Sequence, residues 1–108
     1  MSIKFLNIEN IRSLLWQGKV DFTKHCLNRL NQREIAIRDV KHVIKNGIII
    51  EYYFDDYPYP SCLILGKSIN NKNLHIVCGI SSNLVHVITA YYPDDRNWKE
   101  DMKTRRDE

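Results

Sequence analysis

The stretch that decides the fold is residues 61–92, "SCLILGKSINNKNLHIVCGISSNLVHVITAYY". Three segments rich in β-branched and aromatic residues (61–69, 74–80 and 84–92) are separated by the short polar runs "NNKN" and "SSN". This composition favours strands, and connections this short favour antiparallel neighbours. The stretch therefore predicts an antiparallel meander of three strands.

A fourth strand is predicted immediately before this stretch. The run "IIIEYYF" (48–54) is β-branched and aromatic, which favours a strand. The run "DDYPYP" (55–60) combines two aspartates with two prolines, a composition typical of a loop or turn. This loop would return the chain to the first strand of the meander.

The upstream part of the chain is predicted to be helical. Apolar residues recur at helical spacing in three segments, 8–17, 22–33 and 37–46. An order of helices first and strands afterwards is that of an α+β domain. We expect the N-terminal helices to pack on one face of a four-stranded antiparallel sheet, and a short polar helix to follow Pro93.

The composition fits one small domain. The chain has 108 residues, of which 44% are hydrophobic, and this suits a single domain over 1–108. No apolar run approaches the roughly 20 residues that cross a bilayer, and the start does not resemble a signal peptide. Three widely spaced cysteines favour neither a disulfide framework nor a zinc site. We expect a cytoplasmic protein without a metal, a cofactor or a membrane partner.

The charge is unevenly distributed along the chain. The formal net charge is +3, but residues 1–46 hold nine Lys or Arg against four Asp or Glu. The predicted helices therefore form the electropositive side of the molecule. Such a surface permits binding to a polyanion but does not require it.

The second predicted helix carries basic residues at a regular spacing. In "FTKHCLNRLNQRE" (22–34), His25, Arg29 and Arg33 follow one another at four-residue steps. At about 100° per residue, His25 and Arg29 border the apolar arc that should face the sheet. From there a cation could reach a ligand lying on the sheet. The alternative is that the arginines extend over the edge of the core and His25 caps the helix start.

Two further histidines lie on neighbouring predicted strands. His75 shares one strand face with Gly79, whose lack of a side chain leaves space for a ligand. His86 lies on the last predicted strand. Which alternating set of this strand faces the helices depends on the pairing register, which the sequence leaves open.

Histidines, an arginine and tyrosines without a metal-binding pattern are a set suited to metal-free RNA cleavage. One group removes the proton of the ribose 2′-OH, which attacks the phosphate, and another protonates the leaving 5′-oxygen. Histidine suits both roles because it titrates near neutral pH. Arginine suits the charge on the phosphate because its donors match phosphate oxygens.

Five sequence blocks, in order, resemble the family known as domain of unknown function 4258. They are "FTKHCLNRLNQREI", "DVKHVIKNGIIIEYY", "DDYPYPSCLILG", "LHIVCGI" and "VHVITAYYPDDRNW". They span about residues 20–98 and leave 99–108 as a polar tail. The family is generally placed with RelE-like toxin folds, among small RNases that include BrnT-type toxins. The resemblance implies an architecture of the barnase, colicin and RelE type, and a toxin whose partner is a small antitoxin bearing a zinc finger.

The resemblance also implies functional residues, position by position. His25 and His75 would act as acid and base in an order left open, Arg29 would stabilise the phosphate, and Tyr91 would stack on a base or support a histidine. The residues expected to contact RNA are Arg33, Lys24 and Thr89. His42 and His86 lie inside the blocks but match none of these family positions, and they are set aside.

Two hypotheses follow from these observations. The first is a metal-independent endoribonuclease toxin that cleaves RNA by 2′-OH attack on the phosphate. The second is a non-catalytic module that binds a protein, or binds RNA without cutting it. The net charge of only +3 favours the second, because dedicated RNA-binding domains are usually more basic.

Overall fold

The computed structural model describes residues 6–106 and confirms the α+β class. None of the helices in this range is both long and apolar enough to cross a lipid bilayer. The helices and strands of the described range are, in chain order, α1 (Ile8–Trp16), β1 (Val20–Phe22), α2 (Lys24–Gln32), α3 (Ile37–Asn46), β2 (Ile48–Tyr53), β3 (Ser61–Lys67), β4 (Asn73–Ser81) and β5 (Leu84–Tyr91).

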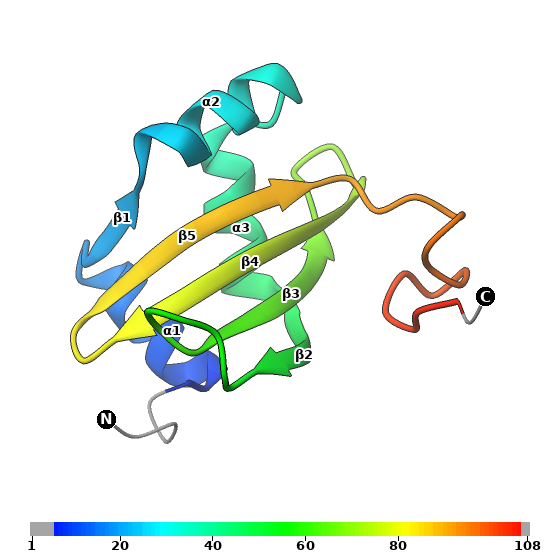
Figure 1. The fold of residues 1–108 in the computed structure, drawn as a ribbon. Helices are drawn as coiled ribbons and strands as arrows, with labels where there is room; N and C mark the ends of the chain where they lie inside the picture. Colours follow the sequence, from blue (N-terminus) through cyan, green and yellow to red (C-terminus); the bar gives the residue numbers. More distant parts are fainter. Residues whose placement is uncertain (1–5, 107–108) are drawn as a thin grey trace.

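The strands form one five-stranded sheet in the order β1-β5-β4-β3-β2 (Figure 1). The strands β2 to β5 are antiparallel neighbours, as predicted. The prediction of a four-stranded antiparallel sheet was nevertheless wrong, because β1 adds a fifth strand that runs parallel to β5. A strand of three residues is too short to show an alternating pattern. Its partner is also distant in sequence, since Val20 lies opposite Val85.

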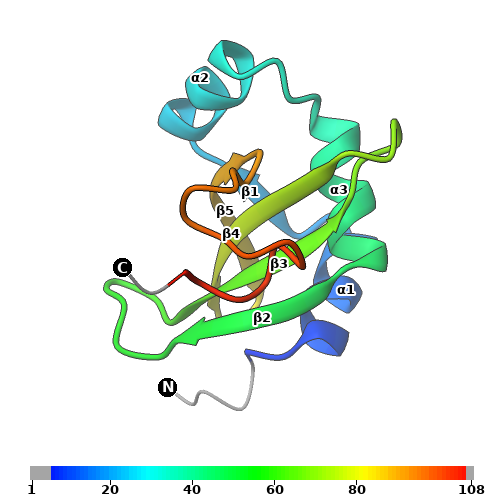
Figure 2. The same cartoon turned by 90° about the vertical axis from the view of Figure 1, so that its right-hand side faces the viewer.

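The two faces of the sheet are covered differently (Figure 2). Helices α1 and α3 pack on one face, and α2 packs against β5. The core lies between the sheet and these helices, and it includes Cys26, Cys62 and Cys78, which are buried free thiols. On the opposite face runs the C-terminal segment, residues 93–106.

Local interactions fix the helix ends next to the sheet. The side chains of Asn7 and Thr23 cap α1 and α2, as their polar oxygens accept backbone N–H groups of the first turn. Helix α3 begins after Ala36, which supplies no side-chain cap. Its C-terminal end is bound instead by Arg12, which donates to the carbonyl oxygens of Ile44 at 2.9 Å and Gly47 at 2.5 Å.

The predicted helix after Pro93 was wrong, because residues 93–106 form turns. Asp94 accepts hydrogen bonds from the backbone N–H groups of the following residues, and Asp101 does the same in the next turn. Aspartates that bond to nearby backbone in this way compete with helix formation. Trp98 and Arg105 close the segment through a β-bridge, and Trp98 is buried against the sheet.

Candidate functional site

The face of the sheet turned away from α1 and α3, here called the outer face, includes His75, Val77 and Gly79 of β4. The alternate residues of this strand, Ile76 and Cys78, belong to the core, and side chains alternate between faces along a strand. The outer face is therefore where the predicted catalytic His75 lies.

A β-bulge in β5 brings more polar residues to the outer face. The register shifts by one residue at Ile88. Before the bulge His86 lies opposite Gly79, and after it Tyr91 lies opposite His75. In a regular strand two residues five apart would point to opposite faces, but here His86 and Tyr91 share the outer face.

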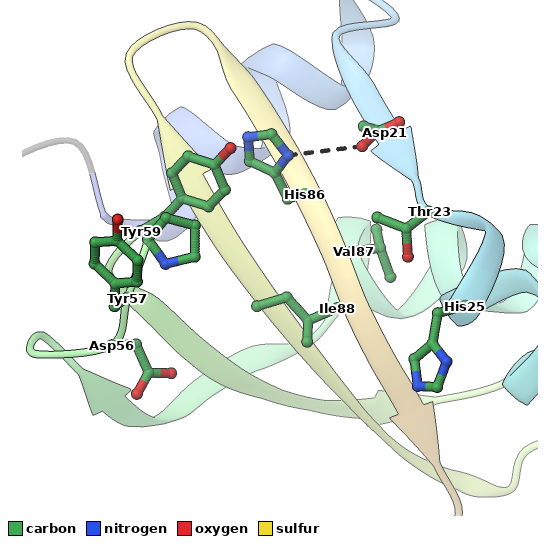
Figure 3. Close-up of a pocket in the computed structure, with 10 residues that line it drawn as sticks. Asp21, Thr23, His25, Asp56, Tyr57, Tyr59, His86, Val87 and Ile88 are labelled. Carbon is green, nitrogen blue, oxygen red and sulfur yellow. Dashed lines mark ion pairs between the residues drawn. The ribbon is translucent and has the colours of Figure 1, made fainter.

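A trough of about 430 Å³ opens on the outer face over β5 (Figure 3). One wall comes from β1 and the start of α2, and the other comes from the loop between β2 and β3. The residues that line the trough are Asp21, Thr23, His25, Asp56, Tyr57, Pro58, Tyr59, His86, Val87 and Ile88.

His25 enters the trough from the first turn of α2 (Figure 3). The helix starts here because the hydroxyl oxygen of Thr23 accepts the backbone N–H of Cys26 at 3.1 Å. His25 is exposed, and its ring has no hydrogen-bond partner within residues 6–106. Its imidazole is therefore available to a ligand. The cap is Thr23, so the alternative that His25 caps the helix was wrong.

His86 is held in the trough from three sides. Its Nε2 lies 3.1 Å from the Ser81 hydroxyl, and its Nδ1 lies 3.7 Å from the carboxylate of Asp21. The ring of Tyr59 stacks on the imidazole with centroids 4.1 Å apart and planes within 5°. At 3.7 Å the contact with Asp21 is longer than a hydrogen bond, so Nδ1 is the less tightly held of the two ring nitrogens.

The basic residues of α2 differ in how freely they can bind a ligand. Lys24 and Arg29 are exposed and form no ion pair with any described residue. Arg33 instead donates to the hydroxyl of Thr89 at 3.1 Å and to the carbonyl of Ala90 at 2.8 Å. Two residues predicted to contact RNA, Arg33 and Thr89, are thus bound to each other, and they tie the end of α2 to β5.

His75 and Tyr91 lie on the outer face but outside the trough, beneath the C-terminal segment. The Nδ1 of His75 is 3.3 Å from the Tyr91 hydroxyl, and its Nε2 is 2.6 Å from the carbonyl oxygen of Met102. Trp98 contacts the imidazole edge-on at 4.5 Å. His75 is fully buried, and burial lowers its pKa, although the Met102 carbonyl opposes this shift.

An ion pair attaches the C-terminal segment to β2. Arg105 donates to both carboxylate oxygens of Glu51, at 2.8 and 3.0 Å, and Tyr53 donates to the same carboxylate at 2.5 Å. Burial opposes ionisation of Glu51, but these hydrogen bonds outweigh it and lower the pKa of the carboxyl. Burial and the bond to Glu51 raise the pKa of Tyr53 to about 12.

The structure separates the two predicted catalytic histidines. His25 lines the trough, whereas His75 does not. Along β4, His75 is four residues from Gly79, the residue opposite His86, which corresponds to about 13 Å of strand. The histidine that shares the trough with His25 is therefore His86, and His75 lies outside the trough beneath the C-terminal segment.

Most of the residues that form this site lie in a part of the chain that matches a known protein family. The family described as Domain of unknown function (DUF4258) matches residues 22–92. The chain belongs to the DUF4258 family. The matched part of the DUF4258 domain contains both trough histidines but excludes α1, Asp21 and the C-terminal segment that covers His75. Searches of curated proteins and of solved structures found no match.

His86 is the site residue of this DUF4258 domain that sequence reasoning missed. Its place depends on the parallel pairing of β1 with β5, which sets Asp21 opposite His86, and on the bulge at Ile88. The sequence held no clear signal for His86, whose neighbours Val85 and Val87 are apolar. His86 lies inside the block "VHVITAYYPDDRNW" but matches none of the family's polar positions, so it was set aside.

Proposed function

We propose that this DUF4258 domain is a metal-independent endoribonuclease and the toxin of a toxin–antitoxin pair. The observation that supports it most is that His25 and His86 line the same open trough. Two imidazoles around one phosphodiester can serve as base and acid. Because His75 is fully buried and does not line the trough, His86 takes the place of His75 in this proposal.

The reaction uses only groups at the trough and the substrate. One imidazole takes the proton of the ribose 2′-OH, and the 2′-oxygen attacks the phosphorus. The bond to the 5′-oxygen breaks, and this oxygen takes a proton from the second imidazole. The products are a 2′,3′-cyclic phosphate and a 5′-hydroxyl. Asp21, close to Nδ1 of His86, orients that ring for the proton transfer.

In this proposal the cations of α2 bind the phosphate groups of the RNA. Lys24 and Arg29 lie on the helix that carries His25, and α2 contains no acidic residue. Their side chains can therefore meet phosphate oxygens without first breaking an ion pair. In this proposal Arg29 stabilises the charge of the reacting phosphate and Lys24 binds the neighbouring backbone.

The RelE-like grouping and the antitoxin belong to the same proposal. They rest on the resemblance of the sequence blocks, and the arrangement of helices on one face of the antiparallel strands β2 to β5 agrees with it. A small antitoxin bearing a zinc finger would be the protein partner.

Cleavage of RNA in the presence of EDTA tests the proposal. We expect the purified protein to produce 2′,3′-cyclic phosphate ends, and His25→Ala or His86→Ala to reduce the rate by about 100-fold or more. The matched control is His42→Ala, because His42 bonds to the carbonyl of Lys67 away from the trough. No cleavage by the wild type, or equal cleavage by all these variants, would contradict the proposal.

The second candidate is a non-catalytic binding module. It is favoured by the internal bonds of several predicted site residues, in particular Arg33 with Thr89 and His75 with Met102. Induced expression in bacteria separates the two candidates. Growth arrest that His25→Ala relieves supports the nuclease, whereas normal growth with the wild type supports the module.

A further inference from the structure

We infer that the trough holds one unpaired guanine of a single-stranded RNA, stacked on Tyr57 and recognised by the carboxylate of Asp56. The inference rests on the proposed function, because it names the substrate of the same site. It starts from the loop between β2 and β3, which forms the wall of the trough opposite His25 (Figure 3).

Tyr57 is the exposed aromatic of this wall. Its side chain is 95% exposed although it lines the trough, so both faces of the ring remain open to a planar partner. The nearby Tyr59 already stacks flat on His86. A nucleobase needs such an aromatic platform to be held outside a helical stack, and Tyr and His are common platforms in sites for single-stranded RNA.

Asp56 is the fixed acceptor beside this platform. Its carboxylate accepts a hydrogen bond from the hydroxyl of Ser61, which is fully buried, and its backbone N–H donates to the carbonyl of Tyr53 at 3.2 Å. The second carboxylate oxygen has no hydrogen-bond partner among the described residues. The orientation of Asp56 is therefore set before a ligand arrives.

The carboxylate of Asp56 binds some nucleobases better than others. It can only accept hydrogen bonds, and each of its oxygens can accept two, so the carboxylate can take two parallel bonds while one oxygen still accepts from Ser61. Guanine offers two neighbouring donors, N1–H and the N2 amino group, on one edge. Uracil offers a single N–H between two carbonyl oxygens, which the carboxylate would repel. Guanine is therefore the base that Asp56 accepts best.

The distribution of charge favours one orientation of the RNA, with its backbone along α2 and its base at the loop. Asp56 makes the loop wall acidic, whereas the opposite helix carries the exposed Lys24 and Arg29 next to the trough-lining His25. A negatively charged backbone is favoured along α2, and the uncharged base is favoured at the loop. Asp21, the other acid of the trough, already faces His86. A base inside a duplex could not reach Tyr57, because its faces are covered by its neighbours.

Binding of short RNAs tests the inference independently of cleavage. Five-nucleotide RNAs with 2′-O-methyl sugars cannot be cleaved, because the attacking hydroxyl is blocked, and they would differ only in a central guanine or uracil. We expect the wild type to bind the guanine RNA about tenfold more tightly. Tyr57→Ala should weaken that binding by about tenfold, and Asp56→Asn should bring guanine and uracil within about twofold.

Tyr52→Ala is the matched control. Tyr52 is 46% exposed and stacks on Phe54 in the β2 region, outside the trough, so its removal should leave RNA binding unchanged. Thermal unfolding of each variant would show that it is folded. Wild-type affinity in Tyr57→Ala, or an unaltered guanine preference in Asp56→Asn, would overturn the inference.

The outcomes also separate this inference from the nuclease. Guanine-selective binding that depends on Tyr57, without cleavage of unmodified RNA, rejects the nuclease and supports the base site. Cleavage with the same KM in the wild type and in Tyr57→Ala supports the nuclease and rejects the base site. Binding of a peptide but of neither RNA rejects both.

Discussion

At the scale of single residues, the fold keeps His75 neutral. Burial lowers its pKa, and Arg105 adds to this effect while Glu51 and the Met102 carbonyl oppose it. In the unfolded chain a histidine titrates at about pH 6.5. Below that pH the imidazole of His75 binds a proton more readily in the unfolded state than in the folded state, so acid shifts the equilibrium towards unfolding.

We therefore expect the free energy of unfolding to fall as the pH is lowered from 7 to 5, and to fall less steeply in His75→Gln. Glutamine does not titrate in this range, and its amide can still donate to the Met102 carbonyl. Urea unfolding followed by circular dichroism at pH 7, 6 and 5 measures both slopes. Parallel slopes in the two proteins would show that His75 does not control this dependence.

Gly47 is required by a close approach of backbone atoms. A Cβ at this position would lie 2.5 Å from the carbonyl oxygen of Leu65 and 2.6 Å from that of Val43. Gly47 follows the last residue of α3, and its φ of −88° is open to any residue. The contact of α3 with β3, and not backbone freedom, explains the glycine.

Gly47→Ala should accordingly destabilise the protein by about 2 kcal/mol or more, since two backbone segments must move apart. Gly18→Ala is the comparison, because Gly18 has open space around it but a φ of +77°. That change should cost about 1 kcal/mol through backbone strain alone. Chemical denaturation measures both values. An equal or smaller loss in Gly47→Ala would contradict the packing argument.

At the scale of elements, the C-terminal segment 93–106 acts as a cover for the outer face. Trp98 is its buried side chain and contacts His75, while the guanidinium of Arg105 lies over the Trp98 ring at 4.6 Å. Arg105 also binds Glu51 of β2. The cover is thus held by the apolar Trp98, by the Arg105–Glu51 ion pair and by the hydrogen bond between His75 and the Met102 carbonyl, and Trp98 contributes more than the partly exposed ion pair.

Trp98→Ala should destabilise the protein by about 3 kcal/mol and open His75 to water, which should raise the pKa of His75 towards its ordinary value. Nuclear magnetic resonance titration of the imidazole protons and thermal unfolding measure the two effects. Trp16→Ala is the control, because Trp16 is 81% exposed on α1 and should cost less than about 0.5 kcal/mol. If His75 still fails to titrate in Trp98→Ala, another part of the chain covers it.

At the scale of the whole molecule, the sequence was sufficient for the elements with a regular pattern. The three helices and the strands β2 to β5 follow apolar periodicities that are visible over six or more residues. The strand β1 was missed because it is three residues long and pairs with a partner about 65 positions away. The C-terminal segment was misassigned because its charges suggested a helix, whereas its aspartates form turns around a buried Trp98.

The candidate site was predicted in part. His25 and Arg29 could be assigned to one side of α2, because a single helix fixes their relative positions. The partner of His25 could not be assigned, because it depends on strand register. His75 and Tyr91 lie on the expected face, but a segment with no recognisable pattern covers them. Short-range geometry was predictable here, and contacts between distant segments were not.

Because of the bulge at Ile88, the number of residues in β5 decides which of its side chains lie on the outer face. Ile88 is the extra residue that places the side chains of His86 and Tyr91 on the same face of the sheet. An in-frame deletion of this single codon would restore regular alternation and send one of the two into the core, without changing any other amino acid. Substitutions at position 88 would not have this effect, because each leaves the number of residues in β5 unchanged. In the evolution of this domain, insertions and deletions in β5 should be rarer than substitutions.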